Sequence, residues 1–315
     1  MARKITVIGA GSVGSTITYT LAVDSIASEI VLIDVNAEKA RGEAMDILQG
    51  MPFSSPTNIY AGTYADAVGS DIVIITCGIP RKAGQSRIDL AQTNVNVIKS
   101  IAPEIARYAP DALYIIVSNP VDILTYVFMR VSGIPEKHII GSGTILDTSR
   151  LRSRIAEYLA ISEQNVHAYV LGEHGDSSFV PWSIAQVGCV TLNDYRNDPR
   201  LAESLRPELD YNEIEEYIRT SGGQIIKRKG ATFYAVSISV CHIVKCLLGS
   251  ASTAMTVSSM MHGEYGIDDV CLSIPFIIGP TGITGHLLPK LTDEEIGKLQ
   301  HSADVLKNVI RQVEI

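Results

Sequence analysis

Hydrophobic positions in the first 120 residues form short β-branched runs separated by longer amphipathic stretches. The runs cover residues 5–8, 30–33, 71–76 and 114–117. Short strands that alternate with helical segments predict parallel βαβ units. Because the runs are apolar on both sides, we expect helices on both faces of the sheet. This is the Rossmann-type doubly wound arrangement of an α/β protein.

The pattern changes after about residue 143. We expect a long helix from near Thr144, a strand near 166–171, two helical segments between 201 and 248, strand-like runs at 254–261 and 270–278, and a capped helix at 293–313. A chain of 315 residues has room for two lobes with a cleft between them. We therefore predict a nucleotide-binding domain at 1–142 and a mixed α+β substrate domain at 143–315.

One stretch, residues 231–250, is long and apolar enough to raise the question of a membrane span. His242 and Lys245 lie inside it, and isolated charges in the middle of a single span are costly. We therefore expect a helix buried in the core or in a subunit contact, and no membrane partner.

The charge and the cysteine content of the chain limit the binding partners and the cellular compartment that we expect. A net charge of −8 argues against a nucleic-acid partner, because phosphate binding requires clustered Lys and Arg. Glycines interrupt the N-terminal apolar run before a secretory signal could form. The five cysteines lack paired spacing. We expect a cytoplasmic protein without a metal, which binds small molecules and further copies of itself.

A glycine-rich turn directly follows the first predicted strand and opens a helix. It reads Gly9-Ala10-Gly11-Ser12-Val13-Gly14. In this context the glycines permit a tight turn, a close approach to a pyrophosphate and close helix packing. The alternative is an ordinary strand–helix turn. Asp34 argues against that alternative, because it ends the next strand 20 residues after Gly14, where a carboxylate binds the ribose hydroxyls of NAD.

A second loop carries a histidine between glycines, in the run Leu171-Gly172-Glu173-His174-Gly175-Asp176. Histidine holds or releases a proton near neutral pH, so His174 is a candidate general acid. A lone loop histidine is more often ordinary surface. Asp147 and Arg150 strengthen the case, because they stand three residues apart and share one face of a helix. Such an aspartate could orient His174, and the arginine could bind a substrate carboxylate; the alternative is a simple intrahelical ion pair.

The segment from Gly78 to Arg87 follows the end of a central strand, where doubly wound sheets bind ligands. It contains three basic residues, Arg81, Lys82 and Arg87. We interpret it as a lid that closes over an anionic substrate and brings Arg87 against the substrate carbonyl. The alternative is an ordinary solvated loop.

Together these motifs resemble the lactate and malate dehydrogenase family over residues 3–313. The segments Ser118-Asn119-Pro120 and Lys229-Gly230-Ala231-Thr232 also match. The resemblance implies a reversible hydride transfer between NAD and a 2-oxo acid, in a dimer or tetramer. It assigns proton transfer to His174 with Asp147, the substrate carboxylate to Arg150, the carbonyl to Arg87, the nicotinamide region to Asn119, and NAD binding to Gly9, Gly11, Val13, Gly14 and Asp34.

Different positions in the sequence favour different substrates. Arg81 stands where lactate enzymes of this family typically carry glutamine, and a buried arginine needs a second substrate carboxylate. This favours oxaloacetate and malate. Thr232 and the run 143–147 resemble the lactate branch and favour the alternative, pyruvate and L-lactate.

Two further questions are whether a sugar phosphate regulates the protein and whether the protein belongs to another functional class. Arg152 and His167 fall where many bacterial lactate dehydrogenases bind fructose 1,6-bisphosphate between subunits; otherwise Arg152 faces solvent and His167 caps a strand. A non-catalytic NAD-binding sensor would not need the set of His174, Asp147, Arg150 and Arg87. The NAD-using glycosidases would need a metal site, for which the sequence offers no candidate.

Overall fold

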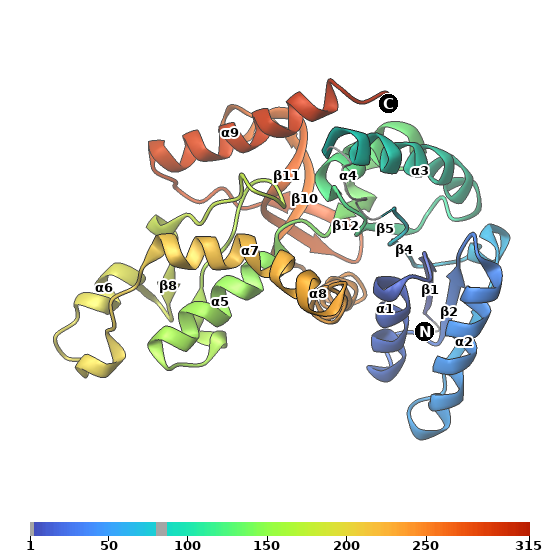
Figure 1. Ribbon diagram of the computed structural model, residues 1–315, viewed down its shortest axis with the longest axis horizontal. Helices are drawn as coiled ribbons and strands as arrows, with labels where there is room; N and C mark the ends of the chain where they lie inside the picture. Colours follow the sequence, from blue (N-terminus) through green and yellow to red (C-terminus); the bar gives the residue numbers. More distant parts are fainter. Residues whose placement is uncertain (1–2, 80–86) are drawn as a thin grey trace.

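A single large sheet organises the computed structural model, which describes residues 3–79 and 87–315 (Figure 1). Its nine strands lie in the order β12-β11-β10-β6-β5-β4-β1-β2-β3. The parallel part consists of β1 (Lys4–Ile8), β2 (Glu29–Ile33), β3 (Asn58–Ala61), β4 (Ile72–Ile75), β5 (Leu113–Ile116) and β6 (Ile139–Gly141). The order 3-2-1-4-5-6 is that of a dinucleotide-binding sheet, so the predicted doubly wound fold is confirmed.

Helices cover both faces of this parallel part. They are α1 (Ser12–Val23), α2 (Ala37–Gly50), α3 (Arg87–Tyr108) and α4 (Val121–Ser132). In Figure 1, α1 lies to the left of β1 and β2, and α3 and α4 lie above the strands, packed against each other. Every residue of β4 and β5 is buried. This burial is the reason that the strands read as continuous apolar runs.

The second half of the chain adds antiparallel strands to the same sheet. They are β10 (Thr253–His262), β11 (Asp268–Gly279) and β12 (Gly282–His286). The join is the pairing of Ser258 on β10 with Gly141 on β6. The sheet is therefore continuous across the predicted boundary at 142/143. A separate small sheet contains β7 (Val166–His167), β8 (Gln186–Val187) and β9 (Val190–Thr191).

Five helices complete the second half: α5 (Ile145–Leu159), α6 (Leu192–Asn197), α7 (Tyr211–Lys229), α8 (Tyr234–Leu247) and α9 (Asp293–Ile310). The apolar stretch 231–250 supplies α8, which packs against α1. Among the described residues, none of the helices has the length and hydrophobicity to cross a membrane. Helix α9 begins with the capping box that its sequence predicts, formed by Thr292 and Glu295.

The prediction of a strand over residues 166–171 is wrong for most of its length. Only Val166 and His167 belong to a strand, and Leu171 makes an isolated antiparallel bridge with Phe179. Between them, side chains of α5 and its N-cap bind the main chain of Val170: Thr148 Oγ1 accepts the Val170 N–H at 3.0 Å, and Thr144 Oγ1 donates to the Val170 carbonyl at 2.6 Å. The segment is extended because it lies along α5, which the local sequence pattern does not reveal.

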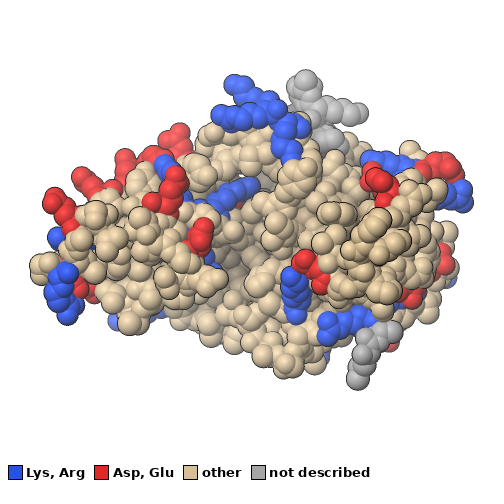
Figure 2. Space-filling view, turned by 90° about the horizontal axis from the view of Figure 1, so that it is seen from below, with Lys and Arg blue, Asp and Glu red and all other residues tan. Residues whose placement is uncertain are grey.

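The molecule has two sides, with α5, α6 and α7 on one and α1 and α2 on the other (Figure 1). Figure 2 shows that the surface between them is hollowed. On that face Lys and Arg form small separate groups near Asp and Glu.

Candidate functional site

The glycine-rich turn between β1 and α1 has the shape that its sequence predicts. Gly9 has φ +110°, and a Cβ there would lie 2.6 Å from Thr76 Oγ1. A Cβ on Gly14 would overlap the Gly9 carbonyl oxygen. At Gly11, by contrast, nothing described lies within 4 Å of the Cβ position. Gly11 therefore leaves open space at the N-terminus of α1, where backbone N–H groups can bind a phosphate.

Asp34 lies beside this turn at the end of β2. Its Oδ2 accepts the Ala10 N–H at 2.6 Å, and its Oδ1 accepts the Asn36 N–H at 2.8 Å. Each oxygen keeps a lone pair for a further donor. An adjoining cavity of about 280 Å³ is lined by Gly9, Asp34 and Tyr64, among others. The turn, the carboxylate and the cavity fit the phosphate, ribose and adenine parts of NAD, and Val13 lies in the first turn of α1 behind them.

His174, Asp147 and Arg150 come together, as the family resemblance implies. His174 Nδ1 lies 2.5 Å from Asp147 Oδ2, and Arg150 Nη1 donates to Asp147 Oδ1 at 2.7 Å. The exposed fractions of the side chains are 8% for Asp147, 15% for Arg150 and 28% for His174. Asp147 is therefore the most buried of the three, and His174 is the most exposed.

The charges of this cluster favour a protonated imidazole. The negative charge of Asp147 raises the pKa of His174, although burial opposes this shift. Burial would raise the pKa of Asp147, but the charges and hydrogen bonds of His174 and Arg150 outweigh it, so this pKa is lowered. The pair is thus held as imidazolium and carboxylate, with Nδ1 donating to Asp147 and Nε2 directed elsewhere.

A further carboxylate binds the same loop from the other side. Asp122 Oδ2 accepts the main-chain N–H of His174 at 2.8 Å, and its Oδ1 accepts the hydroxyl of Ser258 at 2.6 Å. Asp122 is 2% exposed. Sequence reasoning missed both residues. The only available signal was an acidic residue in the first turn of a helix, which is common at solvent-exposed positions.

Asn119 lies at the carboxyl ends of the central strands. Its carbonyl accepts a hydrogen bond from Asn94 Nδ2 at 2.8 Å, and Asn94 Oδ1 accepts the Ile79 N–H at 2.8 Å. The Asn119–Pro120 peptide bond is cis. Asn94 thereby joins the segments after β4 and β5, at the edge where doubly wound sheets bind ligands.

Arg150 and Thr232 line one cavity of about 490 Å³, formed by α5, α7 and the start of α8. The lactate-like threonine and the predicted carboxylate-binding arginine therefore face the same cavity. Arg81 lies outside the described residues. Arg87 is the first residue of α3, but its side chain also lies outside what the structure describes. The roles of these two arginines stay predictions.

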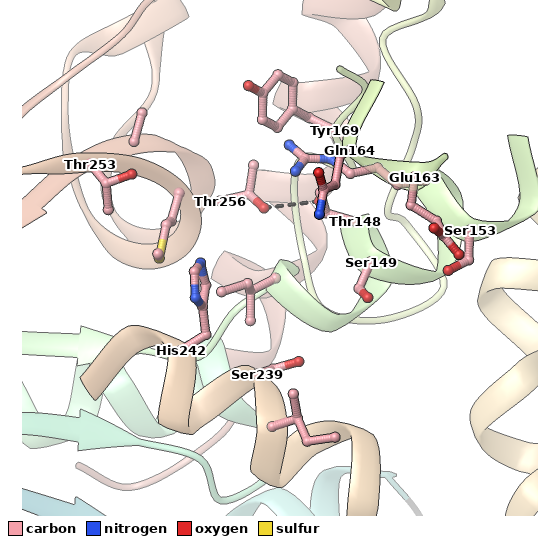
Figure 3. Close-up of a pocket in the computed structure, with 15 residues that line it drawn as sticks. Thr148, Ser149, Ser153, Glu163, Gln164, Tyr169, Ser239, His242, Thr253 and Thr256 are labelled. Atoms are coloured by element: carbon pink, nitrogen blue, oxygen red, sulfur yellow. Dashed lines mark hydrogen bonds between the residues drawn. The ribbon is translucent and has the colours of Figure 1, made fainter. Parts of the chain in front are cut away.

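Figure 3 shows a different cavity, of about 440 Å³, between α5, α8 and β10. Thr148 and Thr256 meet in its wall, with 2.9 Å between their hydroxyl oxygens. Arg152 also lines it, where its Nε donates to the Ala168 carbonyl at 3.1 Å. His167 is exposed on β7, next to Ala168. The structure therefore places the two candidate sugar-phosphate residues close together, on the opposite side of α5 from Asp147.

Within residues 3–79 and 87–315, no three His, Cys, Asp or Glu side chains are grouped so that they could hold a metal ion.

Two family models match successive parts of the chain. The model described as lactate/malate dehydrogenase, NAD binding domain, matches residues 3–141. The model described as lactate/malate dehydrogenase, alpha/beta C-terminal domain, matches residues 144–315. Together they cover nearly the whole sequence, and the first confirms the predicted NAD cofactor.

Individual relatives match over similar lengths. An L-lactate dehydrogenase of Acetivibrio thermocellus is 46% identical, over 99% of this chain and 98% of that protein. An L-lactate dehydrogenase of Clostridium botulinum is 45% identical, over 98% of this chain and 96% of that protein. The crystal structure of the minor L-lactate dehydrogenase from Enterococcus mundtii has a TM-score of 0.94 and 36% identity, and the match covers 100% of this chain and 99% of that one. The chain belongs to the lactate/malate dehydrogenase family and is an NAD-dependent 2-hydroxy-acid oxidoreductase.

Proposed function

We propose that this protein is an L-lactate dehydrogenase that reduces pyruvate to L-lactate. The observation that carries the proposal is its similarity, over nearly the whole chain, to relatives named L-lactate dehydrogenase, at 46% and 45% identity. Thr232, which lines the same cavity as Arg150, supports it. The proposal replaces malate, which the sequence alone favours through Arg81, as the leading substrate.

The described residues suggest how the chain acts on a 2-oxo acid. When bound, NADH supplies the hydride for the carbonyl carbon. His174 donates a proton from Nε2 to the carbonyl oxygen, because Nδ1 is bound to Asp147 and Nε2 has no hydrogen-bond partner in the described part of the chain. Arg150 uses one nitrogen for Asp147 and has others that can bind the substrate carboxylate. The reverse reaction uses His174 as the base.

Malate remains the second candidate because of Arg81. The cost of an unpaired buried charge applies only if the Arg81 guanidinium faces the substrate methyl group when the loop closes. In that geometry, oxaloacetate would be preferred, because its second carboxylate would pair with Arg81.

Steady-state NADH oxidation with each acid tests the assignment. We expect wild-type kcat/KM to be higher for pyruvate than for oxaloacetate; the opposite order would make the protein a malate dehydrogenase.

Arg81→Gln should raise the ratio of pyruvate to oxaloacetate kcat/KM by about tenfold or more, because it removes the attraction for a second carboxylate. Lys82→Gln, at the next position, is the matched control. An unchanged ratio in Arg81→Gln would show that Arg81 does not face the substrate.

We further propose a homo-oligomer in which Arg152 and His167 bind fructose 1,6-bisphosphate. Supporting this, Arg152 uses only Nε for a hydrogen bond among the described residues, and His167 is exposed. The sugar phosphate should lower the KM for pyruvate by about tenfold, within the usual range of allosteric coupling. Arg152→Gln should abolish this response and retain the basal rate, whereas the variant Arg107→Gln, at an exposed position of α3, should respond normally. A wild-type KM that is unaffected by the sugar phosphate would reject this site.

A further inference from the structure

We propose that Asp122 is a positioning residue for His174, which it holds by the main chain and whose imidazolium its carboxylate stabilises. This inference rests on the proposed proton transfer by His174. Asp122 does not touch the reacting atoms in this account. It acts through the histidine.

The contacts of Asp122 join three distant segments of the chain. Asp122 lies in the first turn of α4, its Oδ2 binds the His174 N–H at 2.8 Å, and its Oδ1 binds the Ser258 hydroxyl of β10 at 2.6 Å. Asp122 and Ser258 are 2% and 0% exposed. A buried hydrogen bond to a charged acceptor is strong and directional. The loop that carries His174 is thus fixed to the core of the sheet.

Two carboxylates therefore hold one histidine by different groups. Asp147 from α5 binds the ring at Nδ1, and Asp122 from α4 binds the main-chain nitrogen. The first contact sets the tautomer, and the second sets the position of the Cα from which the ring extends. Nε2 can point consistently at a substrate only when both are fixed.

Both partners of Asp122 are hydrogen-bond donors, so the site suits a carboxylate better than an amide. An asparagine at position 122 could accept one of the two hydrogen bonds, but its NH2 group would face the other donor. Ser258 could rotate its hydroxyl hydrogen to accept from it, whereas the His174 N–H cannot. The isosteric change Asp122→Asn therefore removes the charge, while the asparagine oxygen can accept the His174 N–H and Ser258 can accept from the NH2 group.

The charges around His174 come from three elements. Asp147 and Arg150 face it from α5, Asp122 from α4, and Glu173 precedes it in the loop. The negative charge of Asp122 favours the imidazolium, and the positive charge of Arg150 opposes it. The Cys271 thiol of β11 also lies within electrostatic reach of Asp122. Arg87 lies outside this description.

The ionisation of Asp122 gives the pH range of the effect. Burial raises its pKa to about 6, against the hydrogen bonds from Ser258 and His174 and the positive charge of His174. Because the pKa is raised, Asp122 is a carboxylate above about pH 6 and becomes neutral below it. At neutral pH its charge therefore supports His174, and this support is lost as the pH falls.

The test is the pH profile of kcat/KM for NADH-dependent reduction, measured with whichever of pyruvate and oxaloacetate the wild type reduces faster. Reduction needs protonated His174 and declines as the pH rises through the pKa of that residue. Asp122→Asn should move this decline to lower pH by about half a unit or more. It should also lower kcat/KM by about tenfold and leave the NADH dissociation constant unchanged.

Glu295→Gln is the matched control, because Glu295 is another buried carboxylate that binds a distant loop, through Ser183 N and Oγ at 3.0 and 2.6 Å. It should leave the profile in place. Ser258→Ala is the second variant, in case Asp122→Asn does not fold. A neutral Asp122 binds the His174 N–H more weakly than the carboxylate does, so kcat/KM should fall at acid pH as Asp122 becomes protonated. Ser258→Ala removes a hydrogen bond that lowers the pKa of Asp122, so this low-pH loss of activity should begin at higher pH.

An unchanged profile in a folded Asp122→Asn, or an unmoved low-pH limb in Ser258→Ala, would overturn the inference. Those outcomes leave the proposed function intact. A wild-type protein that reduces neither acid would reject the proposed function and the role of Asp122 together.

Discussion

His174→Asn should lower kcat/KM for 2-oxo-acid reduction by about a thousandfold, within the range attributed to general acid–base catalysis. Asparagine keeps a polar group of similar reach, but it cannot deliver a proton near neutral pH. The affinity for NADH should stay near that of the wild type, because the glycine turn and Asp34 form the predicted nucleotide site elsewhere. Steady-state kinetics and a fluorescence titration with NADH measure the two effects separately.

The control for this variant is His262→Asn. His262 is largely exposed and pairs with Glu136 at 2.9 Å, away from the contacts of Asp147. Its replacement should leave kcat/KM within about twofold of the wild type. Substantial turnover by His174→Asn would reject the proton-transfer role. Loss of NADH binding by the same variant would show that the substitution damages the fold of the cleft.

Arg150→Lys should lower kcat/KM for the 2-oxo acid by about a hundredfold, mainly through a higher KM. A lysine ammonium cannot offer two parallel N–H groups to a carboxylate, and it cannot at the same time keep the geometry of the contact with Asp147. The hundredfold loss of kcat/KM follows from the loss of hydrogen bonds to charged groups, which contribute about 1.5–3 kcal/mol.

Arg154→Lys is the matched control for this change. Arg154 lies one helical turn further along α5, but it pairs with Glu157 and Glu213 at 2.7 and 2.8 Å, away from Asp147. The KM of this control should stay near that of the wild type. A normal KM in Arg150→Lys would mean that another cation binds the substrate carboxylate.

Local patterns predicted much of the first half of the fold. The strands β1, β2, β4 and β5 are largely buried on both faces and are visible in the sequence as short runs rich in apolar residues. The glycines at 9 and 14 have a steric reason that the structure confirms. The shared helix face of Asp147 and Arg150 could also be predicted from the sequence, because helical spacing alone puts the two residues on one face. These features depend on neighbours in the sequence.

The features that sequence reasoning missed depend on distant contacts. The continuation of the sheet from β6 to β10 joins Gly141 to Ser258, and the bond from Asp122 to His174 spans 52 positions. Neither contact leaves a local periodicity. The prediction of a strand after His167 was wrong for the same reason, since Val170 is bound by the side chains of Thr144 and Thr148, and Leu171 makes only an isolated bridge to Phe179. The pairing of Asp147 with His174 had to be inferred from chemistry and family resemblance.

The most direct test of the central claim is a competition in which the wild-type protein receives limiting NADH with equal concentrations of pyruvate and oxaloacetate. The ratio of products reports the ratio of the two kcat/KM values. We predict that L-lactate is the main product and that lactate and malate together account for the NADH consumed. An excess of malate would contradict the assignment to L-lactate dehydrogenase, and the formation of neither product would contradict the proposed reaction itself.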